Sequence, residues 1–216
     1  VHSQYSLLEA TGVPKKIALA AKDLGMPAVA MTDNGNMFGA IEFFFACKDA
    51  DVKPIIGLDA YLAPGSHKAK GDGKSSGATR IVLLAQSFKG YQNLCKLSSI
   101  GYQEGFYYKP RIDYEVLKEY SSDVIALTGG FYGDVAQAFL KAGEDEAHSR
   151  IKKLKDIFSD RLYLELNRTQ VPEWDRINPF LIKAGKDLGI DVVATNDVHY
   201  MKKDDQLSQE VLICIG

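Results

Sequence analysis

Residues 26–63, "MPAVAMTDNGNMFGAIEFFFACKDADVKPIIGLDAYLA", contain two apolar runs separated by an amphipathic stretch. The runs at 26–33 and 52–63 are rich in Val, Ile and Leu and nearly continuous, which is typical of strands buried on both faces of a parallel sheet. The stretch between them, 35–51, has apolar residues at helical spacing. A strand–helix–strand unit of this kind predicts an α/β fold.

The same alternation continues toward both ends of the chain. Four more apolar runs, and a strand ending at residues 1–3, bring the expected number of strands to seven. This repetition predicts an α/β barrel or a doubly wound sheet. Pro179 lies inside the last helical pattern before the final run, where it predicts a kink or a break. The further runs are 79–85, 123–130, 161–166 and 190–197, and the further helical patterns are 13–25, 87–102, 134–143, 145–159 and 172–189.

The composition is that of a soluble globular protein. Of 216 residues, 46% are apolar and 25% charged, and the net charge of −2 gives no global basic field for nucleic acid. The three cysteines, Cys47, Cys95 and Cys214, are widely spaced and predict neither a disulfide framework nor a Cys-based zinc site. We find no signal-peptide or membrane-spanning pattern, so we expect a cytoplasmic protein without a membrane partner.

Residues 64–79, "PGSHKAKGDGKSSGAT", are rich in Gly, Ser and Lys and predict a mobile surface loop. We expect its lysines to be solvated and His67 to be a bystander. His148 is flanked by charges on a predicted helix and is also expected to be solvated. The aromatic residues at 102–108, beside Lys109, are expected to pack in the fold rather than to stack on single-stranded DNA. The loop lysines are Lys68, Lys70 and Lys74, next to Arg80, and the aromatic residues are Tyr102, Phe106, Tyr107 and Tyr108.

Polar side chains gather at the ends of the predicted strands, where parallel α/β folds place their functional sites. In "ATNDVHY" (194–200), Asp197 and His199 are two residues apart, which puts both side chains on one face of an extended strand. Imidazole and carboxylate groups together suit Zn²⁺, Mn²⁺ or Fe, and such a site would serve phosphoester hydrolysis. The alternative is that carboxylates such as Asp33 cap the helices that follow them. The other polar residues at strand ends are His2, Glu9, Asn34, Asp59, Thr128, Glu165 and Asn196.

The chain resembles the PHP (polymerase and histidinol phosphatase) superfamily, in the branch found at the N-terminus of bacterial replicative DNA polymerase III alpha subunits. The resemblance runs along the whole chain in order. It implies a distorted seven-stranded β/α barrel of TIM-like type, formed by residues 1–216 as a single domain. The stretches that carry it are "VHSQYSLLEA" (1–10), residues 26–63, "LLAQSFKGYQNLCKLSSIGYQEGFYYKPRID" (83–113), "VIALTGG" (124–130) and "VVATNDVHYMKKDDQLSQEVLICIG" (192–216).

The resemblance also implies a metal site that has lost part of its ligand set. Metal-binding members of the superfamily hold up to three metals with nine ligands, of which five positions here keep an imidazole or a carboxylate and three do not. It therefore predicts no complete trinuclear cluster. Two outcomes remain open: a single, weakly held Zn or Mn ion, or a metal-free network in which the acids pair with Arg80. The kept positions are His2, Glu9, Asp59, Asp197 and His199, and the lost ones are Asn34, Arg80 and Gly130.

Three functions follow as expectations from the resemblance. The first is a structural domain, cut from a longer chain, that stabilises a polymerase core and docks a proofreading exonuclease. A helix expected at residues 202–216 would lead toward that core, and DNA would be contacted through the full-length protein. The second is a metal-dependent 3′–5′ exonuclease or pyrophosphatase, with Arg111 as a phosphate contact. The alternative for Arg111 is a surface ion pair with Asp113. The third, ranked last, is a free-standing PHP phosphatase.

Overall fold

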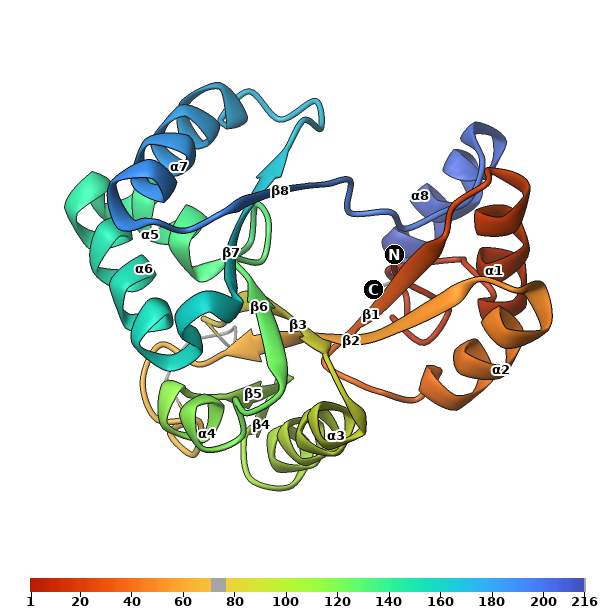
Figure 1. The fold of residues 1–216 in the computed structure, drawn as a ribbon, viewed down its shortest axis with the longest axis horizontal. Coiled ribbons are helices and arrows are strands. Elements are labelled where there is room, and N and C mark those ends of the chain that lie inside the picture. The colour runs from red at the N-terminus through yellow and green to blue at the C-terminus, as the bar shows by residue number, and fades with distance from the viewer. Residues whose placement is uncertain (71–76, 216) are drawn as a thin grey trace.

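The fold is a curled mixed sheet with helices packed on its outer face (Figure 1). We describe it from a computed structural model, in which residues 1–70 and 77–215 are described. The order of strands is β4-β5-β2-β3-β6-β7-β8, and β1 pairs with β2 outside this path. The strands are β1 (Ala28–Asn34), β2 (Lys53–Leu62), β3 (Thr79–Ala85), β4 (Phe106–Tyr107), β5 (Lys109–Ile112), β6 (Val124–Leu127), β7 (Leu162–Asn167) and β8 (Val192–Thr195).

Every helical pattern predicted from the sequence is a helix, and one further helix, α4, was not predicted. Pro179 lies within α7 without ending it, so a break at this position is wrong. None of the described helices is long and apolar enough to cross a membrane. The helices are α1 (Pro14–Asp23), α2 (Ala40–Ala50), α3 (Phe88–Gln103), α4 (Tyr114–Glu119), α5 (Asp134–Ala142), α6 (Glu144–Phe158), α7 (Trp174–Leu188) and α8 (Gln206–Ile215), with single 3₁₀ turns at Ser159–Arg161 and Lys203–Asp205.

The sheet is mixed, so the expectation of an all-parallel sheet is wrong. β3 runs antiparallel to both of its neighbours, β2 and β6, whereas β1–β2, β6–β7 and β7–β8 are parallel. The described part of the β2–β3 connection contains no helix, and a connection without a crossover returns the chain in the opposite direction. Because β3 is reversed, its first residues lie beside the later residues of β2, with Arg80 opposite Tyr61.

The curled sheet is not closed by strand pairing between β1 and β8 in the described residues (Figure 1). The N-terminal residues lie at one end of this seam. The Val1 amino group donates to the Ala30 carbonyl at 3.2 Å, Thr32 N–H donates to the Val1 carbonyl at 3.0 Å, and His2 N–H donates to the Val198 carbonyl at 2.8 Å. The chain start is therefore held between β1 and the segment after β8, although residues 1–3 do not form the predicted strand.

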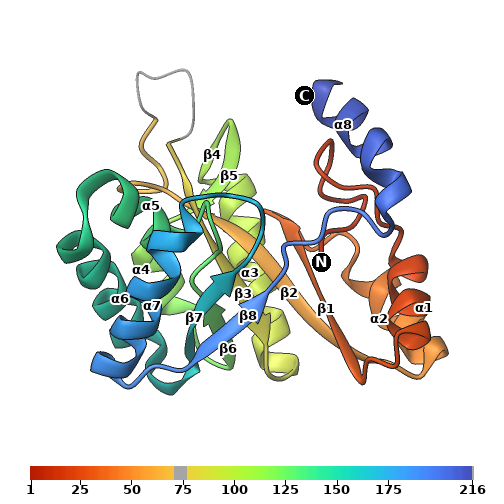
Figure 2. The ribbon, with the colours of Figure 1, turned by 90° about the horizontal axis from the view of Figure 1, so that it is seen from above.

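Two apolar clusters hold the helices to the sheet. The larger lies between the sheet and α3–α7, with fully buried residues such as Leu83, Ile151 and Phe158. The smaller joins β1 to α1 and α2 through residues such as Ile17 and Phe43. Figure 2 shows that α1, α2 and α8 form a lobe apart from the remaining helices, which agrees with the division into two clusters.

The first part of the predicted mobile loop is anchored. His67 is buried, and its backbone N–H and Nδ1 lie 2.9 and 2.5 Å from Asp113 Oδ2. The expectation that His67 lies in a mobile loop is therefore wrong, whereas His67 is not among the three residues that converge on the candidate metal site described below. Residues 71–76 of that loop, including Lys74, lie outside the described residues.

Candidate metal centre at the mouth of the curled sheet

Three predicted ligands meet at one end of the sheet, which we call the mouth. His2 Nε2 lies 2.9 Å from Asp197 Oδ1, and His199 Nε2 lies 3.3 Å from the same oxygen. One ligand atom from each of the three residues lies within 4.8 Å of the others, close enough to hold one metal ion. Asp197 has a positive φ of 40°, so the chain turns directly after β8 and brings Asp197 and His199 against His2.

The backbone of Glu9 orients the His199 ring. His199 Nδ1 lies 2.8 Å from the Glu9 carbonyl, which accepts a hydrogen bond from Nδ1 and leaves Nε2 facing Asp197. This is the arrangement that fixes the tautomer of metal-binding histidines in proteins. Gln209 of α8 donates to the same carbonyl, and the His2 and His199 rings stack with centroids 4.2 Å apart. The imidazole pair is thus positioned in advance of any ligand.

Burial and mutual contact shift the pKa values of His2, Asp197 and His199. Burial lowers the pKa of His2 to about 4, which keeps its imidazole neutral. Burial alone would raise the pKa of Asp197, but hydrogen bonds from His199 and His2 outweigh it and hold that pKa well below the ordinary value. For His199, burial lowers the pKa, but the neighbouring Asp197 raises it by more. A neutral imidazole and an ionised carboxylate are the forms that bind a divalent cation.

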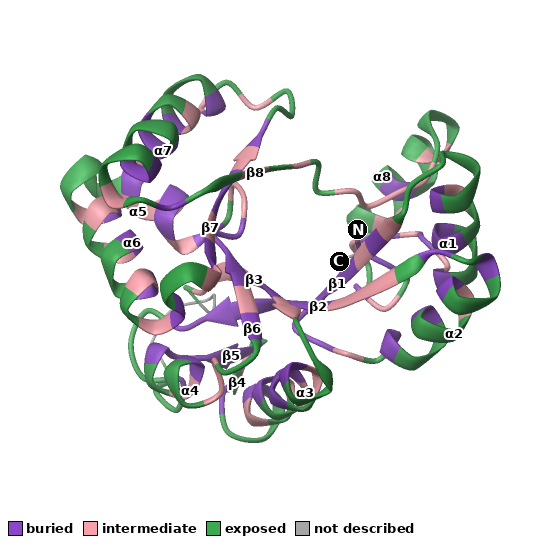
Figure 3. Ribbon diagram, viewed as in Figure 1, coloured by how far each residue is buried: buried purple, intermediate pink, exposed green. Residues whose placement is uncertain are grey.

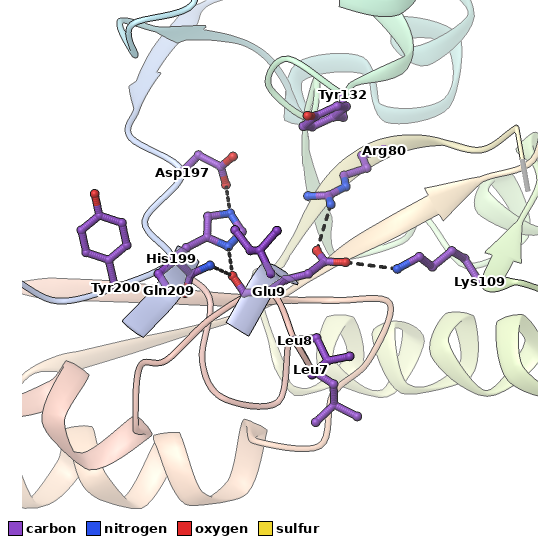
Figure 4. Close-up of a pocket in the computed structure, with 11 residues that line it drawn as sticks. Leu7, Leu8, Glu9, Arg80, Lys109, Tyr132, Asp197, His199, Tyr200 and Gln209 are labelled. Atoms are coloured by element: carbon purple, nitrogen blue, oxygen red, sulfur yellow. Dashed lines mark hydrogen bonds and ion pairs between the residues drawn. The ribbon is translucent and has the colours of Figure 1, made fainter. Parts of the chain in front are cut away.

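The other side of the mouth is occupied by an arginine. Arg80 Nη1 donates to Asp59 Oδ2 and Nη2 to Glu9 Oε2, both at 3.2 Å, and its guanidinium is largely buried. Lys109 donates to Glu9 Oε1 at 3.1 Å, and Asn34 Nδ2 donates to Glu9 Oε2. Both oxygens of Glu9 and one of Asp59 are therefore taken by cationic or amide donors, as Figure 4 shows for Glu9.

Burial and neighbouring cations act in opposite directions on the pKa values of Glu9 and Asp59. Burial would raise the pKa of Glu9, but Lys109 and Arg80 lower it below its ordinary value. Burial raises the pKa of Asp59 to about 7 despite the opposing effect of Arg80, and its Oδ1 has no hydrogen-bond partner. Desolvation explains this difference, because Asp59 is almost fully buried and Glu9 is not.

The position of Gly130 supplies no metal donor. The N–H groups of Gly129 and Gly130 each donate to Glu165 Oε2 at 2.9 Å, and Thr195 Oγ1 donates to Glu165 Oε1 at 2.5 Å. Glu165 is thereby saturated. Asp33 is saturated in the same way by the Ser3 and Ser6 hydroxyls at 2.7 Å, so the expectation that it caps the next helix is wrong.

Arg111 is not at the mouth. Its guanidinium is buried, with Nε donating to the Gly105 carbonyl at 3.1 Å and Nη2 to the His67 and Ala69 carbonyls at 3.0 and 2.7 Å. Neither the predicted phosphate contact nor the alternative surface ion pair with Asp113 agrees with these contacts. Arg111 instead holds the loop after β2 against the turn between α3 and β4.

A pocket of about 680 Å³ opens above the site (Figure 4). Four of the predicted positions line it, and the rest of the lining was not expected from the sequence; the four are Glu9, Arg80, Asp197 and His199. Among these unexpected residues, Lys109 is the one that the sequence could have indicated, because it is a cation that directly follows a run of aromatic residues. The residues not expected here are Leu7, Leu8, Lys109, Tyr132, Tyr200, Gln209 and Ile213.

The PHP domain family matches residues 1–169, and the chain belongs to it. Over nearly its whole length the chain is similar to the DNA polymerase III subunit alpha of Deinococcus radiodurans, with 41% identity over 99% of the chain, and of Borreliella burgdorferi, with 40% over all of it. These alignments cover 17% and 19% of the relatives, so the chain spans less than a fifth of their length.

A solved structure shares the fold at low sequence identity. An amidohydrolase from Chromobacterium violaceum superimposes with a TM-score of 0.59 and 10% identity, over 98% of this chain and 94% of that one. At this identity the likeness concerns the arrangement of strands and helices alone. It supports the description as a curled α/β sheet.

Proposed function

We propose that this chain is the PHP domain of a DNA polymerase III alpha chain and that its role there is structural. The identity of about 40% along the whole chain supports the assignment to that polymerase. The observation that supports the structural role is Arg80, whose guanidinium bridges Glu9 and Asp59 at a position where a metal cluster would need acidic or imidazole donors. DNA synthesis, DNA contacts, a cytoplasmic location and docking of a proofreading exonuclease are proposals for the longer protein.

The residues present fit one metal ion and do not fit a cluster. His2, Asp197 and His199 offer three convergent donors, and imidazole with carboxylate suits Zn²⁺ or Mn²⁺. Beyond them, Glu9 is bonded to cations and an amide, and a second ion near Asp59 would lie beside the Arg80 charge. We therefore propose at most one weakly held divalent ion per chain.

A metal-dependent phosphoesterase, such as a 3′–5′ exonuclease or pyrophosphatase, is the second candidate. The His2–Asp197–His199 group favours it, because a bound divalent ion would supply Lewis acidity and an activated water. In this chain the three side chains would hold the ion, Glu9 would orient His199 through its carbonyl, and Lys109 would add positive charge beside the pocket. A free-standing phosphatase remains the least favoured function.

The open seam between β1 and β8 leaves room for one more strand, which would close the sheet into a barrel. Val1 already pairs beside β1 in the parallel sense, since its N–H and C=O bond to Ala30 and Thr32. We propose that polypeptide ahead of Val1 would continue along β1 and reach β8. Such a strand would give the distorted seven-stranded β/α barrel expected from the sequence, with β4 and β5 as an added hairpin.

Metal content and hydrolysis, measured together, decide between the two functions. The purified chain would be dialysed against trace Zn²⁺ and Mn²⁺, and its metal measured by elemental analysis together with hydrolysis of single-stranded DNA and of pyrophosphate. We expect no more than one equivalent of metal, lost in His199→Ala, and no hydrolysis. Lys203→Ala, an exposed change outside the site, is the matched control. Two or three equivalents, or hydrolysis that His199→Ala abolishes, would replace the structural role by the enzymatic one.

A further inference from the structure

An apolar groove of about 360 Å³ lies between α2 and α3, and its lining shares no residue with the mouth pocket. Its walls are Ile41 and Phe44 of α2 and Phe88 and Tyr91 of α3, and its floor includes Ile56 of β2. Figure 1 shows α2 and α3 standing apart below β2. We call this feature the α2/α3 groove.

The groove follows from the topology of the sheet. Parallel neighbours such as β1 and β2, or β7 and β8, are joined through a helix that covers the outer face, here α2 and α7. The connection from β2 to β3 has no helix in its described part, and β3 returns antiparallel. The outer face of β2 near Ile56 is thus flanked by α2 and α3 but lacks a helix of its own, and Ile56 is only half-buried.

The residues around the groove are large and apolar although they are exposed to solvent. Phe88 is 74% exposed, Ile41 57% and Phe44 41%, and Phe38 and Phe45 are exposed on the same helix or just before it. Figure 3 shows most of the outward surface of α2 as exposed. A contiguous aromatic and aliphatic surface of this kind marks an interface.

We infer that the α2/α3 groove receives an amphipathic helix from the part of the polymerase chain that lies outside these residues. The inference rests on the proposed function, since it requires that longer chain, which we call the parent chain. More than four-fifths of the length of the polymerase relatives lies beyond the region that this chain matches. A groove bounded by two helices over an uncovered strand has the shape that accepts a third helix, with apolar residues at intervals of three and four.

The apolar character favours a permanent contact within one polypeptide. Permanent interfaces resemble a domain core cut in half, whereas surfaces that bind and release separate partners are more polar. Gln86 and Ser87 are the polar members of the groove lining, and both lie just before α3. The remaining lining would be buried by one helix.

The inference can be tested by introducing one cysteine at a time and measuring whether the intact parent chain protects it from labelling. Phe88→Cys and, as a control outside the groove, Leu19→Cys on α1 would each be introduced into the 216-residue chain and into the parent chain; Leu19 is 45% exposed. The rate of maleimide labelling would be measured at each site by mass spectrometry. We expect Phe88→Cys to be labelled at least tenfold more slowly in the parent chain than in the short chain, and Leu19→Cys to be labelled equally in both.

A second variant and a cross-link identify the occupant. Phe44→Glu in the parent chain, on the opposite wall, is expected to return the labelling rate at Phe88→Cys toward that of the short chain. A cross-linker attached at Phe88→Cys should reach a parent-chain peptide with apolar residues three and four apart. Equal labelling in both chains, with DNA synthesis intact, would overturn the inference and leave the proposed function standing.

Two other results would also overturn the inference. If protection appears in the short chain and falls on dilution, the groove binds a second copy instead. If the reading frame ends close to residue 216, no parent chain exists, and the proposed function fails together with the inference.

Discussion

At the scale of single residues, Arg80 determines the character of the mouth. One guanidinium satisfies two acids that come from different segments, Glu9 and Asp59. Burial makes such a pair sensitive to the loss of one partner, because the remaining charge has no water to solvate it. Arg80 thus places a positive charge beside both acids, which opposes a cation at this side of the mouth.

Removing the Arg80 charge is expected to destabilise the fold strongly. At pH 9, about two units above the Asp59 pKa of about 7, Arg80→Met leaves that buried carboxyl either unpaired or forced to take up a proton, which should lower the free energy of unfolding by about 2–3 kcal/mol. Lys109→Met, which removes a more exposed partner of Glu9, should cost less than about 1 kcal/mol. Urea denaturation of both variants measures the difference. Equal losses would mean that Arg80 does not hold the mouth together.

Burial also controls thiol chemistry at Cys47. Burial raises the pKa of Cys47 to about 11, whereas Cys214 is exposed. At pH 9 the Cys47 thiol should be roughly 1% ionised, so iodoacetamide should alkylate it far more slowly than Cys214. The rate at Cys47 should keep rising up to about pH 11. Comparable rates at both cysteines in the native chain at pH 9, measured by mass spectrometry, would contradict this burial.

At the scale of secondary-structure elements, packing favours glycine at a position of α3 where helix propensity alone would favour alanine. Glycine is unfavourable in a helix interior, yet Gly90 lies in the first turn of α3 where an added Cβ would stand 2.0 Å from the Asp123 carbonyl oxygen. The helix can approach the start of β6 this closely because residue 90 has no side chain. The approach, in turn, brings Ser87 to Asp123, with 2.9 Å between their side-chain oxygens.

Gly90→Ala is therefore expected to destabilise the protein despite its better helix propensity. We expect a loss of about 3 kcal/mol, because backbone rather than a flexible side chain must move. Ser99→Ala, on an exposed position of the same helix, should instead change stability by less than about 0.5 kcal/mol. Thermal unfolding followed by circular dichroism distinguishes the two. A stabilised Gly90→Ala variant would show that α3 can shift away from β6.

At the scale of the whole molecule, the mouth joins the two lobes. His2 and Glu9 come from the N-terminal lobe, Arg80 and Lys109 from the sheet, and His199 from the segment that leads to α8. A ligand held between His2, Asp197 and His199 would tie the ends of the chain together. Such a ligand stabilises the folded state, because His2 is 195 residues from Asp197 in the sequence and meets it only in the fold.

Zn²⁺ bound by His2, Asp197 and His199 should thus raise the melting temperature. At a concentration about 100 times its dissociation constant, one bound ion contributes about 2.7 kcal/mol, or roughly 5–10 °C for a chain of this size. A chelator should reverse the shift, and His199→Ala should not show it. Scanning calorimetry with and without Zn²⁺ measures the effect. A shift that persists in His199→Ala would place the ion elsewhere.

The order of strands and helices was determined by the sequence itself. Apolar runs and helical spacing are local properties, so β1, β2, β3, β6, β7 and β8 and the longer helices were predicted close to their bounds. The short β4, β5 and α4 were missed because they hold too few residues to form a period. The resemblance to the family likewise depends on the sequence alone, and it led to His2, Asp197 and His199.

Only the tertiary structure decided what those residues contact. The reversal of β3 brings Arg80 to the mouth, and the curl of the sheet brings Lys109 to Glu9, which is 100 residues away in the sequence. His67, which composition placed in a mobile loop, and Arg111, which the exonuclease hypothesis placed at a phosphate site, are both buried in the fold. Contacts between distant segments depend on strand direction and sheet curvature, and neither is encoded in the period of a single segment.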